Sequence, residues 1–408
     1  MYTYKIGISA QEHDAFVASH PQSNLLQSSN WAIIKDNWSN QRIGFYENDH
    51  LVATASLLIK SLPAGFTMIY IPRGPIMDYT SYELVAFVIS TLKAYGRKQH
   101  ALFIKCDPLL HLKQYPAGTP EENQEENELN LSIVTFLTKI GVEWSGPTKD
   151  LTQTIQPRVQ ANLYAQAFSL DNLPKKTKQA IRSAKNKGVE VIYGGEELLE
   201  DFAALMAKTQ ERKSIHLRGI DYYRKLLATY PNQSYITMAQ LNLPQRLAEL
   251  ETQISKLEQT KATFTENTRV TKVKDVNRQL ERLNHEVDFI NSARKDGKSV
   301  VPLAATLSLI FGDTSENLYA GMDDSYRQYQ APLLTWYETA KEAFRRGCAW
   351  QNMGGVENNL DGGLYQFKAR LNPMIEEFAG EFTIPVSPLH KPAMLAYSIR
   401  KQMRSKHS

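Results

Sequence analysis

Two runs of apolar residues near the middle of the chain repeat with alternating steps of three and four positions. Such spacing gathers apolar side chains along one seam of a helix that pairs with a neighbouring helix. Between the runs, residues 263–268 have weak helix propensity, which favours a chain reversal. The pattern therefore predicts two antiparallel helices of about 20 residues each, with a dimerising coiled coil as the alternative. The repeating residues are Leu243, Leu247, Leu250, Ile254 and Leu257, then Val273, Val276, Leu280, Leu283, Val287 and Ile290.

Outside this region, strand-like runs and amphipathic segments follow an order that occurs twice. Each copy has three strands, then a helix ending in basic residues, then a buried-type strand. These elements are predicted at 42–46, 51–59, 66–71, 82–98 and 101–106 in the first copy, and at 234–241, 299–310, 317–322, 331–346 and 349–354 in the second.

The helical pair falls at one particular junction of this repeated plan. In the first copy the four-residue turn 47–50 joins the first two strands, and in the second copy the pair replaces that turn. A long insert is tolerated there because the strand ends stay adjacent. We therefore predict an α/β fold with mixed sheets in two similar units. The expected boundaries are 1–155 for the first unit, 156–241 and 298–390 for the second, 242–297 for the arm and 391–408 for a C-terminal helix packed on the first unit.

Composition narrows the class of protein without identifying it. The 408 residues carry a formal charge of +4, with 42% hydrophobic and 22% charged residues, as in ordinary globular proteins. Cys106 and Cys348 are isolated, so they match no metal-binding spacing and indicate a reducing compartment. From the mixed polar sequence at residues 1–5 we expect no signal peptide, and the most apolar run, 301–311, is too short to cross a bilayer. We expect a cytoplasmic protein.

Two groups of basic residues could meet an anionic partner. The first lies on a predicted helix that no acidic residue interrupts, and its members are Lys175, Lys176, Lys178, Arg182 and Lys185. The second surrounds the tip of the helical pair and comprises Arg269, Lys272 and Lys274. Such runs are usually solvated surfaces, but both would also suit a phosphate backbone or a lipid headgroup.

Two further segments carry side chains with chemical potential. Arg218 and Tyr222 lie one helical turn apart and could hold a diphosphate, although an arginine packed on a tyrosine is the alternative. Lys368 follows Gly362, Gly363 and an aromatic pair, and it could stabilise an oxyanion or a phosphate. A surface lysine is the alternative there.

No complete motif for a common cofactor is present. The sequence lacks a Walker loop, a nucleophile elbow, a zinc motif and a dinucleotide fingerprint. Residues 351–355 resemble part of an acyl-CoA pyrophosphate loop, but Val356 replaces its final small residue. A turn that ends a strand is the simpler interpretation.

Taken together, motifs along nearly the whole chain resemble the Fem family of non-ribosomal peptidyltransferases, and within it the MurM and MurN branching enzymes of streptococci. Members of this family transfer amino acids from aminoacyl-tRNA to peptidoglycan precursors. The motifs are Leu26–Trp31 with Lys35, Tyr70–Pro75, Thr177–Gly188, Arg212–Lys213 with Arg218 and Tyr222–Tyr223, Asn317–Met322 and Gly363–Lys368.

The resemblance implies two acetyltransferase-like (GNAT-like) domains and an arm that contacts tRNA. The presence of the arm favours lipid II over a nucleotide-linked precursor as the acceptor. By matching positions, Lys35, Arg218, Tyr222 and Tyr319 would bind the diphosphate and sugar of the precursor. Lys368 and Phe367 would approach the reacting ester, and Asp107 matches an acid that could serve as a base or be structural.

The implied reaction is aminolysis of an aminoacyl ester by the side-chain amine of the stem-peptide lysine. It needs aminoacyl-tRNA, expected to be alanyl- or seryl-tRNA, but no metal or other cofactor. We expect a monomer that contacts the inner face of the cytoplasmic membrane peripherally. The alternatives are an adaptor that binds tRNA or membrane without catalysis, and a GNAT enzyme that uses acyl-CoA.

Overall fold

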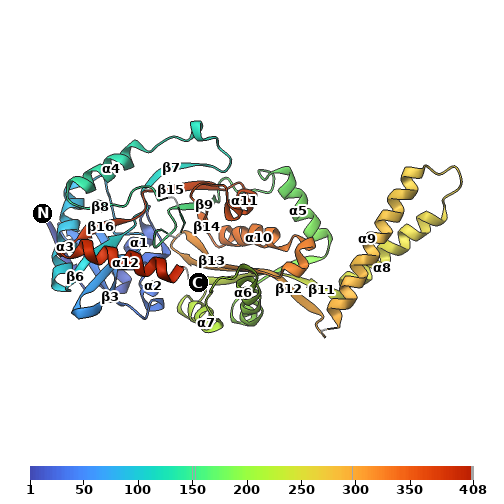
Figure 1. Cartoon of the computed structure of the whole chain (residues 1–408), viewed down its shortest axis with the longest axis horizontal. Helices are drawn as coiled ribbons and strands as arrows, with labels where there is room; N and C mark the ends of the chain where they lie inside the picture. The colour runs from blue at the N-terminus through green and yellow to red at the C-terminus, as the bar shows by residue number, and fades with distance from the viewer. Residues whose placement is uncertain (149, 152, 296, 406–408) are drawn as a thin grey trace.

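The computed structural model describes residues 1–148, 150–151, 153–295 and 297–405. Figure 1 shows two β-sheets, each covered by helices, with a helical arm that projects from the second. The first sheet has the strand order β1-β2-β3-β4-β6-β16-β8, and β5 pairs with β3. Its strands are β1 (Tyr2–Ile6), β2 (Ser39–Glu47), β3 (His50–Ser61), β4 (Thr67–Ile71), β5 (Ile76–Met77), β6 (Ala101–Cys106), β8 (Glu143–Trp144) and β16 (Phe382–Pro385).

The second sheet also contains eight strands, in the order β10-β11-β12-β13-β14-β9-β15-β7. These are β7 (His111–Pro116), β9 (Val159–Tyr164), β10 (Val189–Gly194), β11 (Ser234–Asn242), β12 (Val300–Phe311), β13 (Thr314–Met322), β14 (Trp350–Gly355) and β15 (Met374–Phe378).

The strand order confirms the duplicated plan predicted from the sequence. The series β1-β2-β3-β4-β6 in the first sheet corresponds to β10-β11-β12-β13-β14 in the second. In each series the neighbours are antiparallel until the last pair, β4 with β6 or β13 with β14, which is parallel. A helix makes the crossover to that parallel strand, α3 (Tyr82–Lys98) in the first half and α10 (Ala331–Arg345) in the second. The two halves are thus similar mixed α/β units, as expected.

The sheets exchange a strand across the predicted boundaries. Strand β7 lies in the first half of the sequence but pairs with β15 in the second sheet. Conversely, β16 comes from the second half and pairs with β6 in the first sheet. The boundaries 1–155 for the first unit, and 156–241 with 298–390 for the second, stay predictions for the bulk of each unit, but two elements cross them.

The predicted arm consists of α8 (Leu243–Ala262) and α9 (Val270–Arg294), inserted between β11 and β12. Its apolar seam is buried inside the chain, with Leu250, Leu283 and Ile290 at most 4% exposed. The Asn242 side chain caps α8 by accepting the backbone N–H of Gln245 at 3.0 Å. Because each helix covers the seam of the other, the hairpin explains the apolar repeat without a second chain.

The three largest apolar cores hold most of the helices against the sheets. One lies between the first sheet and α3 with α4 (Glu128–Lys139). A second joins one face of the second sheet to α5 (Lys175–Asn186), α10 and the base of the arm. The third is shared by both halves, because α1 (Ala10–Ser19) and α2 (Ser29–Ile34) pack with α6 (Leu199–Lys213), α7 (Ile220–Thr229) and the other face of the second sheet.

The last helix, α12 (His390–Ser405), packs on the first sheet as predicted. Met394 joins a cluster with Met68 and Leu102, and the Tyr397 ring lies 6.3 Å from that of Phe103. Residues 406–408 of the predicted segment lie outside the described residues.

Candidate active site

Lys368 lies on the short helix α11 (Gly363–Ala369), whose start is fixed by Glu357. The two carboxylate oxygens of Glu357 accept the backbone N–H groups of Leu364 at 3.0 Å and Tyr365 at 2.9 Å. A Cβ atom on Gly362 would lie 2.1 Å from this carboxylate, so a glycine is needed there. The glycine at position 362 thus leaves room for the Glu357 carboxylate that caps α11. This cap fixes the start of the helix that carries Lys368.

The Lys368 side chain is buried and retains a single hydrogen bond within the described part of the chain. Only 5% of the residue is exposed, and its Nζ donates to the Gly355 carbonyl at 2.7 Å. The Nζ also lies 5.7 Å from the centre of the Trp336 ring. Burial lowers the pKa of Lys368 to about 7; Glu357 opposes this shift and Lys213 adds to it. Near neutral pH the side chain can therefore act either as a cation or as an amine.

Lys368 and Phe367, both expected near the reacting ester, line one cavity of about 460 Å³. Trp336 forms another wall, with its ring 5.9 Å from Phe367 and close to perpendicular. The remaining lining comes from α6, α10, α11, the middle of β12 and the end of β13, together with Glu357. It includes Thr209, Arg212, Lys213, Ala304, Ala305, Ala320, Gly321, Met322, Pro332 and Thr335. A partly apolar cavity with a few cations suits a small polar group held near one lysine.

The predicted diphosphate residues gather where α2 and α7 meet. Lys35 follows the last residue of α2, and the Arg218 guanidinium lies 5.0 Å from the Tyr222 ring. The Tyr222 ring in turn lies 6.2 Å from that of Tyr319 on β13. The Ser28 and Tyr230 hydroxyls, 2.8 Å apart, hold the two helices together. The structure thus joins residues from three distant segments, as the resemblance implied.

The charges in this cluster favour an anion. Burial, together with the nearby Arg218 and Lys225, lowers the pKa of Lys35 to about 8. Lys225 is itself paired with Asp36 at 2.6 Å. A bound diphosphate would offset the repulsion between these adjacent cations, and the phenols could donate hydrogen bonds to it. Residues 212–218 connect this cluster to the cavity of Lys368, since Arg212 and Lys213 line that cavity.

A basic groove of about 930 Å³ runs between α5 and the base of the arm. Six lysine and arginine side chains line it, against a single carboxylate, Glu286. Three of them (Lys187, Arg246 and Arg282) were not predicted from the sequence, which indicated anion-binding cations of the arm only at its tip. Near its start α5 touches the end of α11, because the Thr177 hydroxyl donates to the Arg370 carbonyl at 2.7 Å. The groove therefore leads away from the helix that carries Lys368. The six cations are Lys175, Lys178, Arg182, Lys187, Arg246 and Arg282.

The predicted anion-binding residues do not all reach this groove. Lys175, Lys178 and Arg182 line it, whereas Lys176 is exposed outside its lining and Lys185 is paired with Glu338 at 2.9 Å. The tip residues Arg269, Lys272 and Lys274 are exposed at the far end of the arm. The structure thus separates the tip from the groove.

Asp107 lies away from the lining of the Lys368 cavity. Its buried carboxylate accepts the Tyr70 hydroxyl at 2.8 Å and the Arg73 backbone N–H at 2.7 Å. Burial raises its pKa to about 6, although Arg73 opposes the shift. These contacts tie together the ends of β4 and β6, so a structural role accounts for the geometry, and the role as a base stays a prediction.

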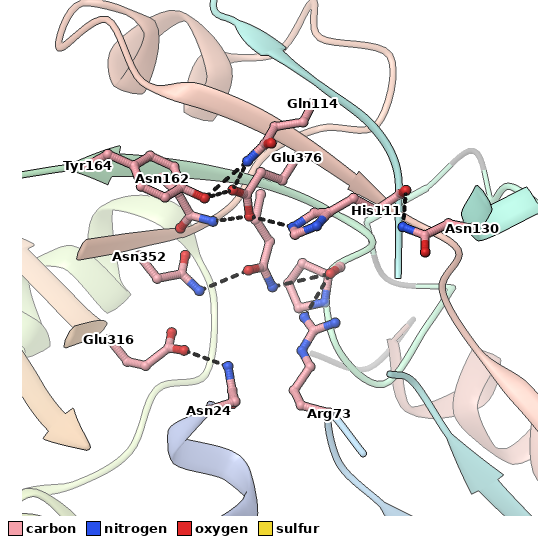
Figure 2. Close-up of polar contacts among 12 residues, drawn as sticks. Asn24, Arg73, His111, Gln114, Asn130, Asn162, Tyr164, Glu316, Asn352 and Glu376 are labelled. Carbon is pink, nitrogen blue, oxygen red and sulfur yellow. Dashed lines mark hydrogen bonds and ion pairs between the residues drawn. The ribbon is translucent and has the colours of Figure 1, made fainter. Parts of the chain in front are cut away.

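Sequence reasoning missed a buried polar cluster on the face of the second sheet that meets the first half. Figure 2 shows it across β13, β14, β9, β15 and β7, with Asn24 and Arg73 entering from the first half. Glu316 accepts from Asn24 at 2.9 Å, and burial raises its pKa to about 7. Glu376 pairs with His111 at 3.2 Å. These polar residues are far apart in the sequence and share no regular spacing, so no motif predicted the cluster.

The segment that resembles a CoA loop forms a turn at the end of β14, as the simpler interpretation held. The Gly354 N–H is bonded to the Asn352 side chain and the Val356 N–H to the Val159 carbonyl. Since these N–H groups have partners within the chain, this turn does not present them to a pyrophosphate.

No helix in the described ranges combines the length and apolar character needed to span a bilayer. Among solved structures, a crystal structure of FemX aligns with 97% of this chain and all of its own, with a TM-score of 0.75 and 24% identity. The similarity therefore extends through the arm and both sheets.

Relatives of known sequence cover nearly the same span. A lipid II:glycine glycyltransferase of Staphylococcus epidermidis is 25% identical over 93% of this chain and 92% of its own length. The Staphylococcus aureus protein of the same name is 26% identical over the same shares. The FemAB family matches residues 8–398, and the chain accordingly belongs to the FemAB family.

Proposed function

We propose that this protein transfers an amino acid from aminoacyl-tRNA to lipid II and so builds peptidoglycan cross-bridges. The observation that carries the proposal is the buried Lys368 in a cavity that adjoins a cationic cluster, within a chain of the FemAB family. The names of its relatives specify glycine and lipid II. We propose alanine or serine as the transferred residue and the stem-peptide lysine as its acceptor.

The cationic cluster would hold the acceptor. Arg218 and Lys35 supply charge for a diphosphate, and the phenols of Tyr222 and Tyr319 supply neutral donors. Because the diphosphate of lipid II carries the lipid chain, the protein would bind it at the inner face of the cytoplasmic membrane. We propose that it does so as a monomer. Residues 212–218 would then lead the rest of the substrate towards Lys368.

The groove beside α5 would hold the donor. Five of its six cations suit a phosphate backbone, whereas Arg246 is buried and paired with Glu286 at 2.8 Å. Helix α5 begins at the end of α11. A tRNA whose acceptor stem lay along α5 would direct its 3′ end to Phe367 and Lys368. The groove would thus account for use of a nucleic-acid donor in a GNAT-like fold.

The reaction would join these two substrates without a covalent enzyme intermediate. The acceptor amine attacks the ester carbonyl, a C–N bond forms, and the C–O bond to the ribose breaks. The protonated Lys368 would stabilise the oxyanion of the tetrahedral intermediate, and the amine proton would pass to the ribose oxygen, to water or to Asp107. Holding two large anions in register supplies much of the acceleration.

Incubation with lipid II and separately prepared alanyl-, seryl- and glycyl-tRNA tests the proposal. The expected result is a lipid II product heavier by one alanine or serine residue, detected by mass spectrometry. A gain of glycine alone would correct the donor. No mass gain with any aminoacyl-tRNA would contradict catalysis and favour a binding protein.

Lys368→Ala tests the oxyanion role. Removing one such donor should slow single-turnover transfer by about 10²- to 10³-fold, because the charge develops only in the transition state. Since the ammonium form is needed, the rate of the unmodified protein should fall as pH rises above about 7, the pKa of Lys368. Lys213→Ala removes a neighbouring positive charge and should move this fall to higher pH.

Lys98 is an exposed lysine at the end of α3, so Lys98→Ala controls for loss of a surface charge. An unchanged rate for Lys368→Ala with saturating substrates would refute the role.

A further inference from the structure

The carbonyl that holds Lys368 belongs to a turn built by one side chain. The Asn352 Oδ1 accepts the Gly354 N–H at 2.6 Å, which closes an Asx turn at the end of β14. Gly354 has φ +83°, a left-handed conformation that this turn uses. The next residue, Gly355, directs its carbonyl at the Lys368 Nζ, 2.7 Å away. The position of that carbonyl therefore depends on Asn352.

The amide of Asn352 is itself held in one orientation. Its Nδ2 donates to Gln160 Oε1 at 2.8 Å, and Glu316 lies opposite Asn352 on the adjacent strand β13. Asn352 is only 3% exposed, so water cannot readily replace these partners. Because the nitrogen of Asn352 donates to Gln160, its oxygen is directed at the Gly354 N–H.

The opposite side of the turn is closed by Pro157. A Cβ atom on Gly355 would lie 2.5 Å from the Pro157 ring, so the proline leaves room for glycine only. The Pro157 carbonyl accepts from Arg73 Nη2 at 3.0 Å and from Gln160 Nε2 at 3.3 Å. Gln160 thus supports both Asn352 and Pro157, and Arg73 brings the first half of the chain to the same point.

We propose that Asn352 is a positioning residue for Lys368, fixing the turn whose Gly355 carbonyl holds the lysine Nζ in the cavity. The inference rests on the proposed function, because it concerns the lysine assigned there to the oxyanion. Asn352 touches neither substrate; it acts through the backbone of residues 354 and 355. It also gives a role to the segment that otherwise resembles a CoA loop.

Asn352→Ala should slow single-turnover transfer by about 10- to 100-fold, the range expected when a reacting group is misplaced by about 1 Å. The lipid II and tRNA concentrations that give half the maximal rate should not change, because the substrate-binding side chains remain. A displaced carbonyl would no longer favour the ammonium form of Lys368. The fall in rate at high pH should therefore begin at a lower pH than in the parent.

Two variants separate positioning from general support of the fold. Asn352→Ser keeps an oxygen that can accept the Gly354 N–H, so it should recover most of the rate. Asn162→Ala disturbs the same buried cluster beside Glu376 but leaves the turn intact, so its transfer rate should match the parent. If Asn352→Ala fails to fold, Gln160→Ala keeps Asn352 and should shift the pH profile in the same direction by less.

A rate and pH profile for Asn352→Ala equal to those of the parent would overturn the inference. Equal losses in Asn352→Ala, Asn352→Ser and Asn162→Ala would also overturn it, because they would indicate a cluster that only stabilises the fold. Lys368→Ala distinguishes this failure from failure of the proposed function. If Lys368→Ala is slow and Asn352→Ala is not, only the positioning role is wrong.

Discussion

At the scale of single residues, burial decides which of the many cations can do chemistry. Lys368 has a lowered pKa because its side chain is buried, with a carbonyl and an indole ring as neighbours. Arg218 is exposed and stacked on a tyrosine, which suits binding of a substrate anion. The two cations therefore predict different kinetic effects when each is removed.

Arg218→Ala should act through acceptor binding. A hydrogen bond to a charged group is worth about 1.5–3 kcal/mol, so the lipid II concentration for half-maximal rate should rise by roughly 10- to 100-fold. The tRNA requirement should stay the same, as measured by varying each substrate in turn. Arg224→Ala is the matched control, because Arg224 lies on α7, which begins two residues after Arg218, and pairs with Glu196 and Asp221. A comparable rise in that variant would contradict a specific role for Arg218.

At the scale of elements, the sequence predicted those with a regular apolar period and missed those without one. The arm, the helix at 82–98 and the strand at 101–106 were recovered because their apolar residues repeat at helical or strand spacing. Strands β9 and β15 were missed because Gln160, Asn162 and Glu376 face the buried polar cluster and interrupt the pattern. The short helix α11 was missed because its cap, Glu357, lies outside the motif.

Prediction of the site was limited for a similar reason, because its residues have no regular spacing in the sequence. Lys35, Arg218, Tyr222 and Tyr319 were named through a family motif, and no spacing in the sequence shows that they meet. The groove depends on how the arm leaves the second sheet, so Arg246 and Arg282 could be identified only from the structure. Helical periodicity fixes the face of a helix, not its angle to a neighbour.

Charge reversal in the groove tests which part of the arm contacts tRNA. A triple variant, Lys178→Glu, Arg182→Glu and Arg282→Glu, should raise the tRNA concentration needed for transfer and reduce its dependence on salt. Each lost phosphate contact should lower the slope of log affinity against log salt by about 0.7–0.9. The matched control reverses Arg269, Lys272 and Lys274 at the tip, an equal change in charge, and should have a smaller effect. A larger effect at the tip would assign tRNA binding there.

At the scale of the whole molecule, the exchanged strands join the two halves into one cooperative folding unit. Strand β16 brings Glu381 beside Lys105 in the first sheet, where the pair is 2.6 Å apart and almost fully buried. The other carboxylate oxygen of Glu381 accepts the backbone N–H of Ile155 at the junction between the halves. Neither sheet can therefore be completed while the other half is unfolded.

Urea denaturation should consequently show one transition, with circular dichroism and tryptophan fluorescence changing at the same midpoint. Glu381→Ala should lower the free energy of unfolding by about 3–5 kcal/mol, because it leaves the buried Lys105 without its partner. Lys341→Ala removes a half-exposed partner of Glu338 and should cost less than about 1 kcal/mol. Two separate transitions in the parent protein, or loss of only the first in Glu381→Ala, would show that the halves fold independently despite the exchange.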